Sequence, residues 1–511
     1  MLLNTLSPEE RELFTQFGFA PTIKTPYSQI HHAFEDYAQK HPHKIAVTHL
    51  HRSITYGELH QKAEALASQL TQKGIGPGDN VGLFLERSIE MIIGLMAILK
   101  TGAAYIPQDA RITPHRQLNH IINLAQPRIV LTLEYLRHNI PSSSSLEIIS
   151  IDQMDLSHLT YKREVKKYGE NCFILFTSGT TGMPNGVKVT HKNVCNLLLN
   201  QPGNLGTKES DVVSQILNIS FDMAAWEIFT ALSYGATLLI RGKSIEEAVT
   251  RSSVVISTPS ILSSIDEKKC QKVRVVAVAG EPCPRILADK WSHFCTFYNS
   301  CGPTEVTIVN TMKEYNPFDS KLTIGKPTPN NTIYILNEDL KPCKIGEVGE
   351  IWAGGDCVTN GYLKNSELTS DRYRPDPFLG NDSKMFRTRD LGRWTPDGEL
   401  EHYGRTDDQV KIKGFRVELD SISRTLESTR SCRQAVTLKL DSENLVSFVR
   451  PSSLCLYDLD KALKKNLPYF YHPSHIIPVD NFPFTDRGKI DKRKLIIEAV
   501  QLTKKKASKV C

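Results

Sequence analysis

The stretch from residue 172 to residue 188 combines small, hydroxylic and basic residues that suit phosphate chemistry. An apolar run ends at Thr177, serine, threonine and glycine follow as far as Gly182, and a helix-like segment covers residues 191–200. Glycine lets a backbone approach a ligand closely, and hydroxyl groups donate hydrogen bonds. A strand, a polar loop and a helix in this order can wrap backbone N–H groups around phosphate oxygens. We therefore predict a phosphate-binding loop, with a serine- and glycine-rich surface linker as the alternative.

A single acidic residue, Asp222, interrupts an apolar stretch that ends in Trp226 and Glu227. Burying a carboxylate costs several kcal/mol unless a cation meets it. The alternative is a capping or turn aspartate, because Ser220-Phe-Asp222 could start a helix. The residue therefore indicates either a helix start or a site for a cationic group.

Three later stretches carry charged residues next to turn formers. Glu305 follows a Gly-Pro turn and could hold magnesium on triphosphate oxygens. Asp390 could accept both hydroxyls of a ribose, or it could lie in a surface turn. Lys489 stands in a loop between Gly488 and Asp491, where a lysine is usually surface decoration.

Short strands alternate with helices around these stretches. Residues 53–59 and 81–107 show the alternation, and residues 254–259 and 275–282 are apolar strands that end in breakers. This order predicts a parallel α/β sheet, in which ligands bind at the strand ends. The longest apolar run, residues 91–99, predicts a buried helix ended by Gly102 and is too short to span a membrane.

The size and composition are those of a globular protein with several lobes. The 511 residues suggest two to four lobes, and the net charge of +6 is scattered, without a basic face for nucleic acid. The eleven cysteines include no Cys-x-x-Cys pair, and the polar N-terminus is not a signal peptide. We expect a cytoplasmic monomer with free thiols that binds neither nucleic acid nor membrane.

Together, these motifs resemble the adenylate-forming (ANL) superfamily, and most closely the amino-acid-activating adenylation domains of nonribosomal peptide synthetases. The resemblance covers about residues 30 to 495. It is carried by residues 177–187 (TSGTTGxPKGV), 221–227 (FDxxxWE), 298–305 (YGPTE), 386–391 (YxTGDL) and 483–491 (PLTxxGKxD). It implies a large multi-lobed α/β domain over residues 1–403, a hinge at 404–407 and a small α+β lid over 408–511.

The resemblance also implies an ATP site. Lys489 is then the catalytic lysine, Thr304 a phosphate contact and Glu305 the Mg²⁺ ligand. Asp390 and Arg405 reach the ribose. The remaining residues assigned to ATP are Thr177, Ser178, Gly179, Thr180, Thr181, Gly182, Lys188, Gly280, Glu281, Ser300, Cys301 and Gly302.

By the same resemblance, Asp222 receives the α-ammonium group of an amino acid. The pocket residues are Asp222, Met223, Trp226, Ser257, Ala277, Ala279, Ser300, Ile308, Val309 and Lys489. The small residues leave volume and the larger ones give apolar walls, so we expect a bulky hydrophobic or aromatic substrate.

After activation, the lid of such enzymes rotates about a hinge, here Asp407, and Lys411 occupies a position used in thioester formation. The acceptor is the phosphopantetheine thiol of a carrier protein. Only 22 residues follow Lys489, so the resemblance implies a separate carrier or further synthetase domains.

Three residues depart from the family pattern: Asn185 replaces a lysine, Cys301 an aromatic residue and Arg389 a glycine. Lys188 could compensate for Asn185, and Arg389 could form an ion pair with Asp390. An aryl- or acyl-CoA ligase, and a nucleotide-binding homologue with weak or no activity, therefore remain as alternatives to the amino-acid ligase.

Overall fold

The structure is a computed structural model, and it describes residue 3 and residues 6–157, 168–177, 183–380, 382–407, 409–429, 431–483 and 490–507. The chain forms two compact units. Unit 1 contains Met1–Arg111, Ile121–Phe176 and Gly186–Thr406, and unit 2 contains Ile112–His120, Thr177–Asn185 and Asp407–Cys511.

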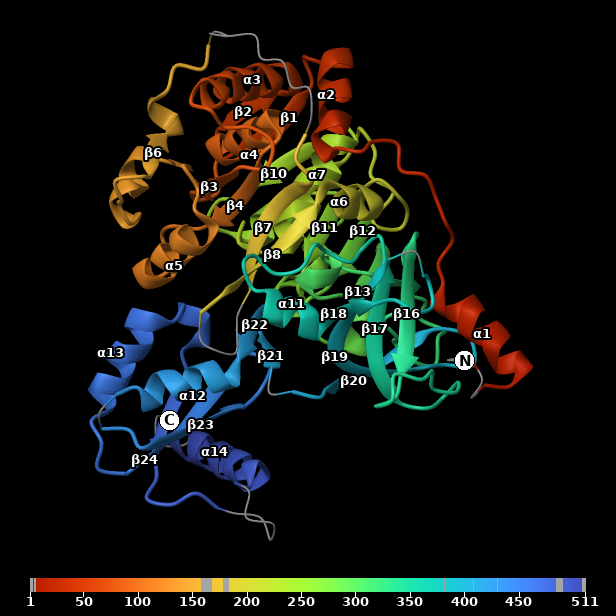
Figure 1. Cartoon of the computed structure of the whole chain (residues 1–511), viewed down its shortest axis with the longest axis vertical. Coiled ribbons are helices and arrows are strands. Elements are labelled where there is room, and N and C mark those ends of the chain that lie inside the picture. The colour runs from red at the N-terminus through yellow and green to blue at the C-terminus, as the bar shows by residue number, and fades with distance from the viewer. Residues whose placement is uncertain are drawn as a thin grey trace. The chain divides into compact units, whose positions relative to one another are not determined.

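The first sheet of unit 1 has six strands and lies among the N-terminal helices (Figure 1). β3, β4, β5 and β6 pair in parallel, and β4 also pairs in parallel with β7. In spatial order the strands are β6 (Glu147–Ser150), β5 (Ile129–Thr132), β3 (Asn80–Phe84), β4 (Ala104–Gln108), β7 (Asn171–Thr177) and β8 (Asn185–Thr190).

The predicted helix over residues 91–99 is confirmed as α4 (Ile89–Thr101). Nearly all of its residues are buried, as expected of a helix that is apolar on every side. The Ser88 hydroxyl accepts a hydrogen bond from the Met91 N–H at the start, and Gly102 ends the helix with φ of 84°. That left-handed conformation suits glycine.

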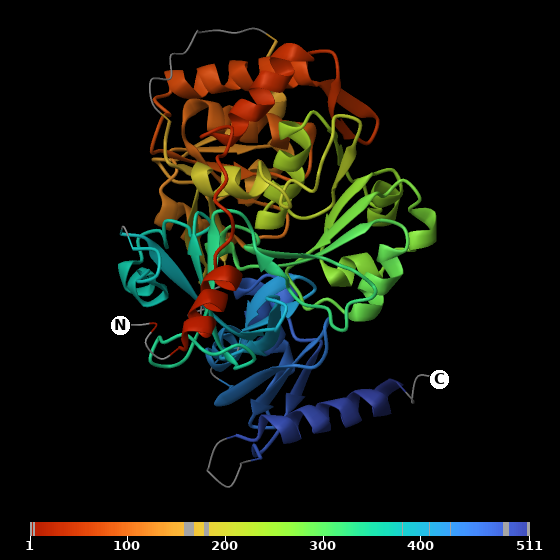
Figure 2. The same cartoon turned by 90° about the vertical axis from the view of Figure 1, so that its right-hand side faces the viewer.

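The second sheet of unit 1 has nine strands and carries most of the predicted site (Figure 2, green). Its central strands are parallel and rich in valine and isoleucine, as expected of strands buried on both faces. In spatial order they are β15 (Lys326–Pro327), β14 (Thr311–Glu314), β13 (Thr296–Cys301), β12 (Val275–Val278), β11 (Val254–Ser257), β9 (Val212–Gln215), β10 (Thr237–Ile240), β1 (Ile45–His49) and β2 (Arg52–Thr55).

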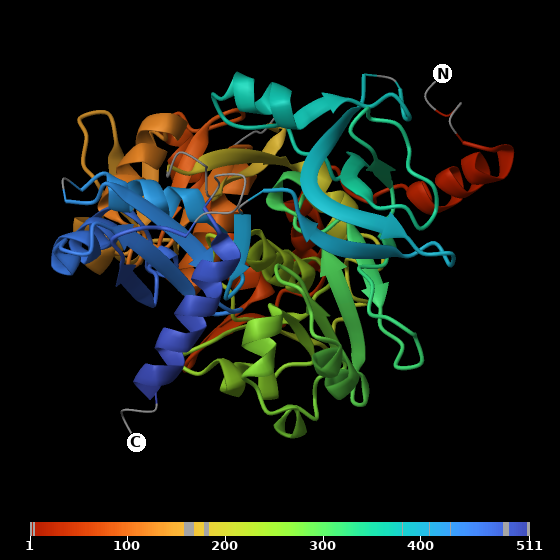
Figure 3. The same ribbon diagram turned by 90° about the horizontal axis from the view of Figure 1, so that it is seen from below.

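The third sheet of unit 1 is antiparallel and includes a long bent strand, β19, drawn in cyan in Figure 3. The pairing of β19 with β20 shifts register between Asp390 and Gly392. The strands are β16 (Asn331–Leu336), β17 (Gly349–Gly355), β19 (Lys384–Trp394), β18 (Tyr373–Pro375) and β20 (Leu400–Arg405).

Helices cover these sheets, and none of the helices in the described part of the chain is both long and apolar enough to cross a membrane. Besides α4, the α-helices that precede residue 407 are α1 (Pro8–Gly18), α2 (Ile30–Lys40), α3 (Tyr56–Gln72), α5 (His115–Ala125), α6 (His191–Leu198), α7 (Asp222–Ser233), α8 (Ile245–Thr250), α9 (Pro259–Ser263), α10 (Arg285–Ser292) and α11 (Ser366–Arg372).

Unit 2 has an α+β core of its own. Its hairpin turns at Lys413 and Gly414, whose φ values of 50° and 83° suit a two-residue turn between twisted strands. Its elements after residue 407 are β21 (Gln409–Ile412), β22 (Phe415–Glu418), α12 (Leu419–Glu427), β23 (Gln434–Lys439), β24 (Leu445–Arg450), α13 (Leu456–Asn466), β25 (His475–Pro478) and α14 (Lys492–Ala507).

Candidate active site

The carboxyl ends of β11, β12 and β13 lie side by side and bring several predicted substrate residues to one edge of the sheet. Ala277 lies on β12 and Ala279 directly after its end. Residues two apart on a strand share a face of the sheet, and both alanines are buried. Ala277 pairs with Tyr298, so Ala277 shares a face of the sheet with Tyr298 and, two residues on, with Ser300. Ser257 instead pairs with Val278. Alternation therefore places the Ser257 side chain on the opposite face, where its hydroxyl donates to the carbonyl of the next residue.

Asp222 and Thr304 meet although they are 82 residues apart in the chain. Asp222 is the first residue of α7, and the Thr304 hydroxyl donates to its Oδ2 over 2.6 Å. The N-cap of α7 is Phe221, without a side-chain cap. The expectation that Asp222 starts a helix is thus confirmed, and its carboxylate lies at the helix N-terminus, where the helix dipole favours negative charge.

Glu227, one turn further along α7, holds the chain segment that leads to Asp222. Its side chain is fully buried and accepts hydrogen bonds from the backbone N–H groups of Ile216 (2.7 Å) and Leu217 (3.3 Å). The Arg87 guanidinium donates to the carbonyls of the same two residues. Burial raises the pKa of Glu227 to about 8, although the two backbone N–H groups and Arg87 act against this shift.

Glu305 is a fully buried carboxylate directly after Thr304. The Tyr362 hydroxyl donates to its Oε1 over 2.7 Å. Mg²⁺ prefers hard oxygen ligands and is usually bound by one or two carboxylates together with phosphate oxygens and water. One carboxylate held in place next to a predicted phosphate contact fits that requirement.

The turn from Gly302 to Val309 is tightly packed and strained. A Cβ atom at Gly302 would lie 2.6 Å from the Val309 Cα atom, so only glycine fits there. Thr307 and Ile308 adopt left-handed φ values of 60° and 68°. Such values are rare for β-branched residues and cost about 1–3 kcal/mol each. The packing around the turn holds this strained backbone in place, and Ile308 and Val309 are both buried in it.

Asp390 lies in a cluster of partners in the third sheet of unit 1. Arg405 donates to Asp390 Oδ1 over 2.8 Å, and His402 Nε2 lies 3.3 Å from the same atom. Burial would raise the pKa of Asp390, but His402 and Arg405 outweigh it and hold the pKa below its usual value. The predicted ion pair with Arg389 is wrong. Arg389 has φ of 63°, which turns it away from the strand geometry, and its guanidinium pairs with Asp371 at 3.3 Å.

Gly280 and Glu281 follow β12 at the same sheet edge. Gly280 has φ of 86°, a conformation that suits glycine, and Glu281 Oε2 accepts the Ser260 N–H over 2.9 Å. Lys188 lies on β8, where its backbone exchanges hydrogen bonds with residues 360 and 361. Cys301 ends β13, where its carbonyl accepts the Asn310 N–H.

The remaining predicted residues belong to unit 2. Thr177 ends β7 and is buried, Asp407 is the first residue after unit 1, and Lys411 lies on β21. Six predicted residues lie outside the described part of the chain: Ser178, Gly179, Thr180, Thr181, Gly182 and Lys489.

Three residues with close contacts to the predicted site were not assigned a role from the sequence. Tyr362 contacts Glu305, His402 contacts Asp390, and Glu227 holds the approach to Asp222. Glu227 belongs to the motif at residues 221–227, so the sequence marked its position, whereas Tyr362 lies outside the motifs named above. Nothing in the sequence marks His402, because its proximity to Asp390 arises from strand pairing.

Comparisons with known proteins identify the family of the chain. A family model described as "AMP-binding enzyme" matches residues 34–363. Adenylate-forming reductase 06235 of Coprinopsis cinerea is 44% identical over 99% of this chain and 50% of its own length. Gramicidin S synthase 1 of Brevibacillus brevis is 34% identical over 91% of this chain and 44% of its own length.

Solved structures share the fold. NpsA-ThdA from Klebsiella oxytoca, an artificially fused adenylation–PCP di-domain of a nonribosomal peptide synthetase, superposes with a TM-score of 0.78. It is 26% identical and covers 88% of this chain and 93% of its own. The chain spans about half the length of the curated relatives it matches. The chain belongs to the AMP-binding, adenylate-forming (ANL) superfamily, in which its homologues include the adenylation domains of nonribosomal peptide synthetases.

Proposed function

We propose that this adenylate-forming enzyme activates an α-amino acid with a bulky hydrophobic side chain. ATP supplies the AMP group, pyrophosphate leaves, and the aminoacyl group then passes to the phosphopantetheine thiol of a carrier protein. The observation that supports an amino acid is the carboxylate of Asp222 at the start of α7, held by the Thr304 hydroxyl.

Asp222 can receive an ammonium group because it is an anion with a fixed place. Its Oδ2 accepts the Thr304 hydroxyl, and its partly buried position strengthens an ion pair compared with open water. Since Thr304 is also the proposed phosphate contact, the bond would bring the ammonium site close to the reacting carboxylate and α-phosphate.

The pocket beyond Asp222 suits a large side chain. Ala277, Ala279 and Ser300 are small, while Trp226 is fully buried at its wall. The other proposed pocket residues are Met223, Ile308 and Val309, all buried. Ser257 would take part in the pocket only through its main chain at the strand end, since alternation turns its side chain to the opposite face of the sheet.

The proposed ATP site is built around Asp390 and Arg405. A carboxylate held ionised can accept both ribose hydroxyls, and an arginine beside it can donate to the nucleotide. Gly280 and Glu281 would lie near the adenine. Mg²⁺ on Glu305 would neutralise charge on the triphosphate.

Unit 2 supplies the proposed lid. The boundary between Thr406 and Asp407 supports Asp407 as the hinge and residues 408–511 as the lid domain. Lys489 would then stabilise the charge that develops at the α-phosphorus, and Lys411 would act in thioester formation. A closed lid would also protect the mixed anhydride from water.

A second candidate is activation of a carboxylic acid without an α-ammonium group, as the first step of a reduction. The observation in its favour is the 44% identity to a protein named as an adenylate-forming reductase, of which this chain covers half. In that case the part of the protein beyond this chain would carry the reductive step.

ATP–pyrophosphate exchange with the standard amino acids and with matched aryl and alkyl acids tests the proposal. We expect exchange with large hydrophobic amino acids and none with deamino analogues. Asp222→Asn should raise the amino-acid KM roughly 10–100-fold, because hydrogen bonds between charged groups contribute about 1.5–3 kcal/mol. Asp397→Asn, on an exposed loop, is the matched control. Equal exchange with the deamino acids, unaffected by Asp222→Asn, would favour the second candidate.

A further inference from the structure

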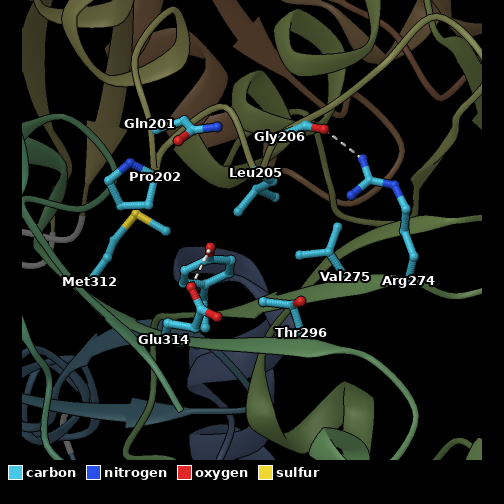
Figure 4. A pocket seen from close by; sticks show the side chains of 10 residues that line it. Gln201, Pro202, Leu205, Gly206, Arg274, Val275, Thr296, Met312 and Glu314 are labelled. Atoms are coloured by element: carbon cyan, nitrogen blue, oxygen red, sulfur yellow. Dashed lines mark hydrogen bonds between the residues drawn. The ribbon is translucent and has the colours of Figure 1, made fainter. Parts of the chain in front are cut away.

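Unit 1 contains a cavity at the opposite end of the strands from the proposed ATP site. Its volume is about 470 Å³, within the range of small-molecule sites. Figure 4 shows Pro202, Leu205, Val275 and Met312 around it, with Thr296 and Glu314 on one side. The cavity therefore has a mixed wall, in which apolar side chains lie beside polar ones.

The floor of the cavity is the same sheet face that carries the proposed substrate pocket. Val275 is two residues before Ala277 on β12, and Tyr298 is two residues before Ser300 on β13. Met312 on β14 pairs directly with Ser300. Two residues along a strand span about 6.6 Å with the side chains on one face. The cavity thus begins one side-chain layer beyond Ala277 and Ser300.

The opposite wall also continues from the proposed pocket. The loop at residues 201–206 forms this wall, and its Gly203 carbonyl accepts the Trp226 Nε1–H over 2.7 Å. Trp226 lies one turn of α7 beyond Asp222, and its indole holds the loop in place. A Cβ atom at Gly203 would lie 2.1 Å from the Leu197 carbonyl oxygen, so this loop conformation requires glycine.

The charged residues of the cavity are occupied by partners within the protein. Arg274 donates to Asp211 Oδ1 over 2.8 Å and to the Gly206 carbonyl over 2.9 Å. Tyr298 donates to Glu314 Oε2 over 3.1 Å. The Arg274 charge is therefore met by Asp211, and the apolar side chains of the wall are available to contact a ligand.

Ser300 lies between the proposed substrate pocket and the cavity, and its side chain carries an unusual polar group. Its side chain is 3% exposed, and its hydroxyl has no hydrogen-bond partner among the described residues. Leaving such a group without a partner destabilises the folded protein. A bound molecule that passes Ser300 can supply the missing hydrogen bond through a polar atom.

We propose that this cavity is a distal subsite for the far end of an elongated side chain of the substrate amino acid. The inference rests on the proposed function, because Asp222 anchors the amino end of the substrate. An α-amino acid such as 4-phenyl-phenylalanine reaches the distal layer, whereas phenylalanine ends at the proximal one.

Two measurements on the full chain test the subsite. In ATP–pyrophosphate exchange, Thr296→Trp should lower the preference for 4-phenyl-phenylalanine over phenylalanine by about tenfold, because the indole fills the cavity. In the absence of ATP, 4-phenyl-phenylalanine should slow the alkylation of the thiol introduced by Thr296→Cys, followed by peptide mass spectrometry, and alanine should not. Ser53→Trp and Ser53→Cys, at an exposed strand position outside the cavity, are the matched controls.

The outcomes separate the subsite from the proposed function. Exchange with phenylalanine, but neither exchange with nor protection by 4-phenyl-phenylalanine, overturns the subsite and leaves the function standing. An unchanged preference in Thr296→Trp also overturns it. Protection without exchange for any amino acid supports the subsite and rejects amino-acid activation. The absence of both protection and exchange rejects the subsite and the proposed function together.

Discussion

Replacing Gly302 by alanine tests whether the turn after β13 sets the geometry of the site. The new Cβ atom would lie 2.6 Å from the Val309 Cα atom and 2.9 Å from the Asn310 nitrogen. The first distance is about 0.8 Å short of an ordinary 3.4 Å contact, and both neighbours are backbone atoms that no rotamer change can move. The segment from Val309 to Asn310 must therefore shift.

This displacement sets the expected loss of stability and of activity in Gly302→Ala. Overpacking that forces a backbone shift costs about 1–3 kcal/mol, so the free energy of unfolding should fall by that amount. Misplacing binding groups by about 1 Å can cost on the order of 100-fold in rate. Val309 is a proposed pocket wall, and Thr304 follows Gly302 by two residues. We therefore expect kcat/KM for exchange to fall by about 10–100-fold.

Urea denaturation and ATP–pyrophosphate exchange on the same preparation measure the two effects. Gly76→Ala is the control, because a Cβ atom there meets nothing within 4 Å. It should change the free energy of unfolding by less than about 1 kcal/mol. If Gly302→Ala unfolds at the wild-type urea concentration and exchanges at the wild-type rate, the packing argument is wrong.

Three further substitutions probe other contacts of the site. Burial raises the pKa of Glu227 from 4.5 to about 8, so the folded protein holds a proton that the unfolded chain has lost, and wild-type stability falls as pH rises between these values. Glu227→Gln should remove this pH dependence of the free energy of unfolding, which amounts to at most about 1.4 kcal/mol per pH unit in urea denaturation. Parallel pH profiles of the wild type and Glu227→Gln would contradict this expectation. Tyr362→Phe removes a hydrogen-bond donor to Glu305, so it should lower the free energy of unfolding by about 1–3 kcal/mol. It should also raise the Mg²⁺ concentration at half-maximal exchange. An unchanged Mg²⁺ titration would count against Glu305 as the metal ligand. Arg389→Gly should raise the thermal midpoint slightly, by the equivalent of about 1 kcal/mol, since φ of 63° suits glycine; a lower midpoint would show that the Asp371 ion pair matters more.

Much of the fold could be predicted from the sequence because its signals are local. The apolar run before Gly102 predicts α4, and the valine-rich runs that end in breakers predict β11 and β12. The motifs also place Asp222, Thr304 and Glu305 in one family pattern. The roles of these residues remain predictions.

The rest of the site depends on tertiary register, which local signals do not carry. The contact between Thr304 and Asp222 joins elements 82 residues apart, and the face on which Ser257 lies follows from its pairing with Val278. The partner of Arg389 could not be inferred from its neighbour in sequence, because a left-handed φ redirects its side chain. The helix start at Asp222, by contrast, was predictable from local sequence, because Ser220-Phe-Asp222 is a typical opening of a helix.

Because the backbone at Thr307 and Ile308 is left-handed, a substitution that changes substrate specificity there also changes the stability of the fold. Ile308 is a proposed wall of the pocket, so a lineage that changes its substrate would change this side chain. Asparagine or glycine would relax the backbone, whereas valine or another β-branched residue would keep the strain. Each new specificity at this position therefore carries its own stability change. Variants with altered substrates should be easiest to obtain from a background that is already more stable than the natural chain.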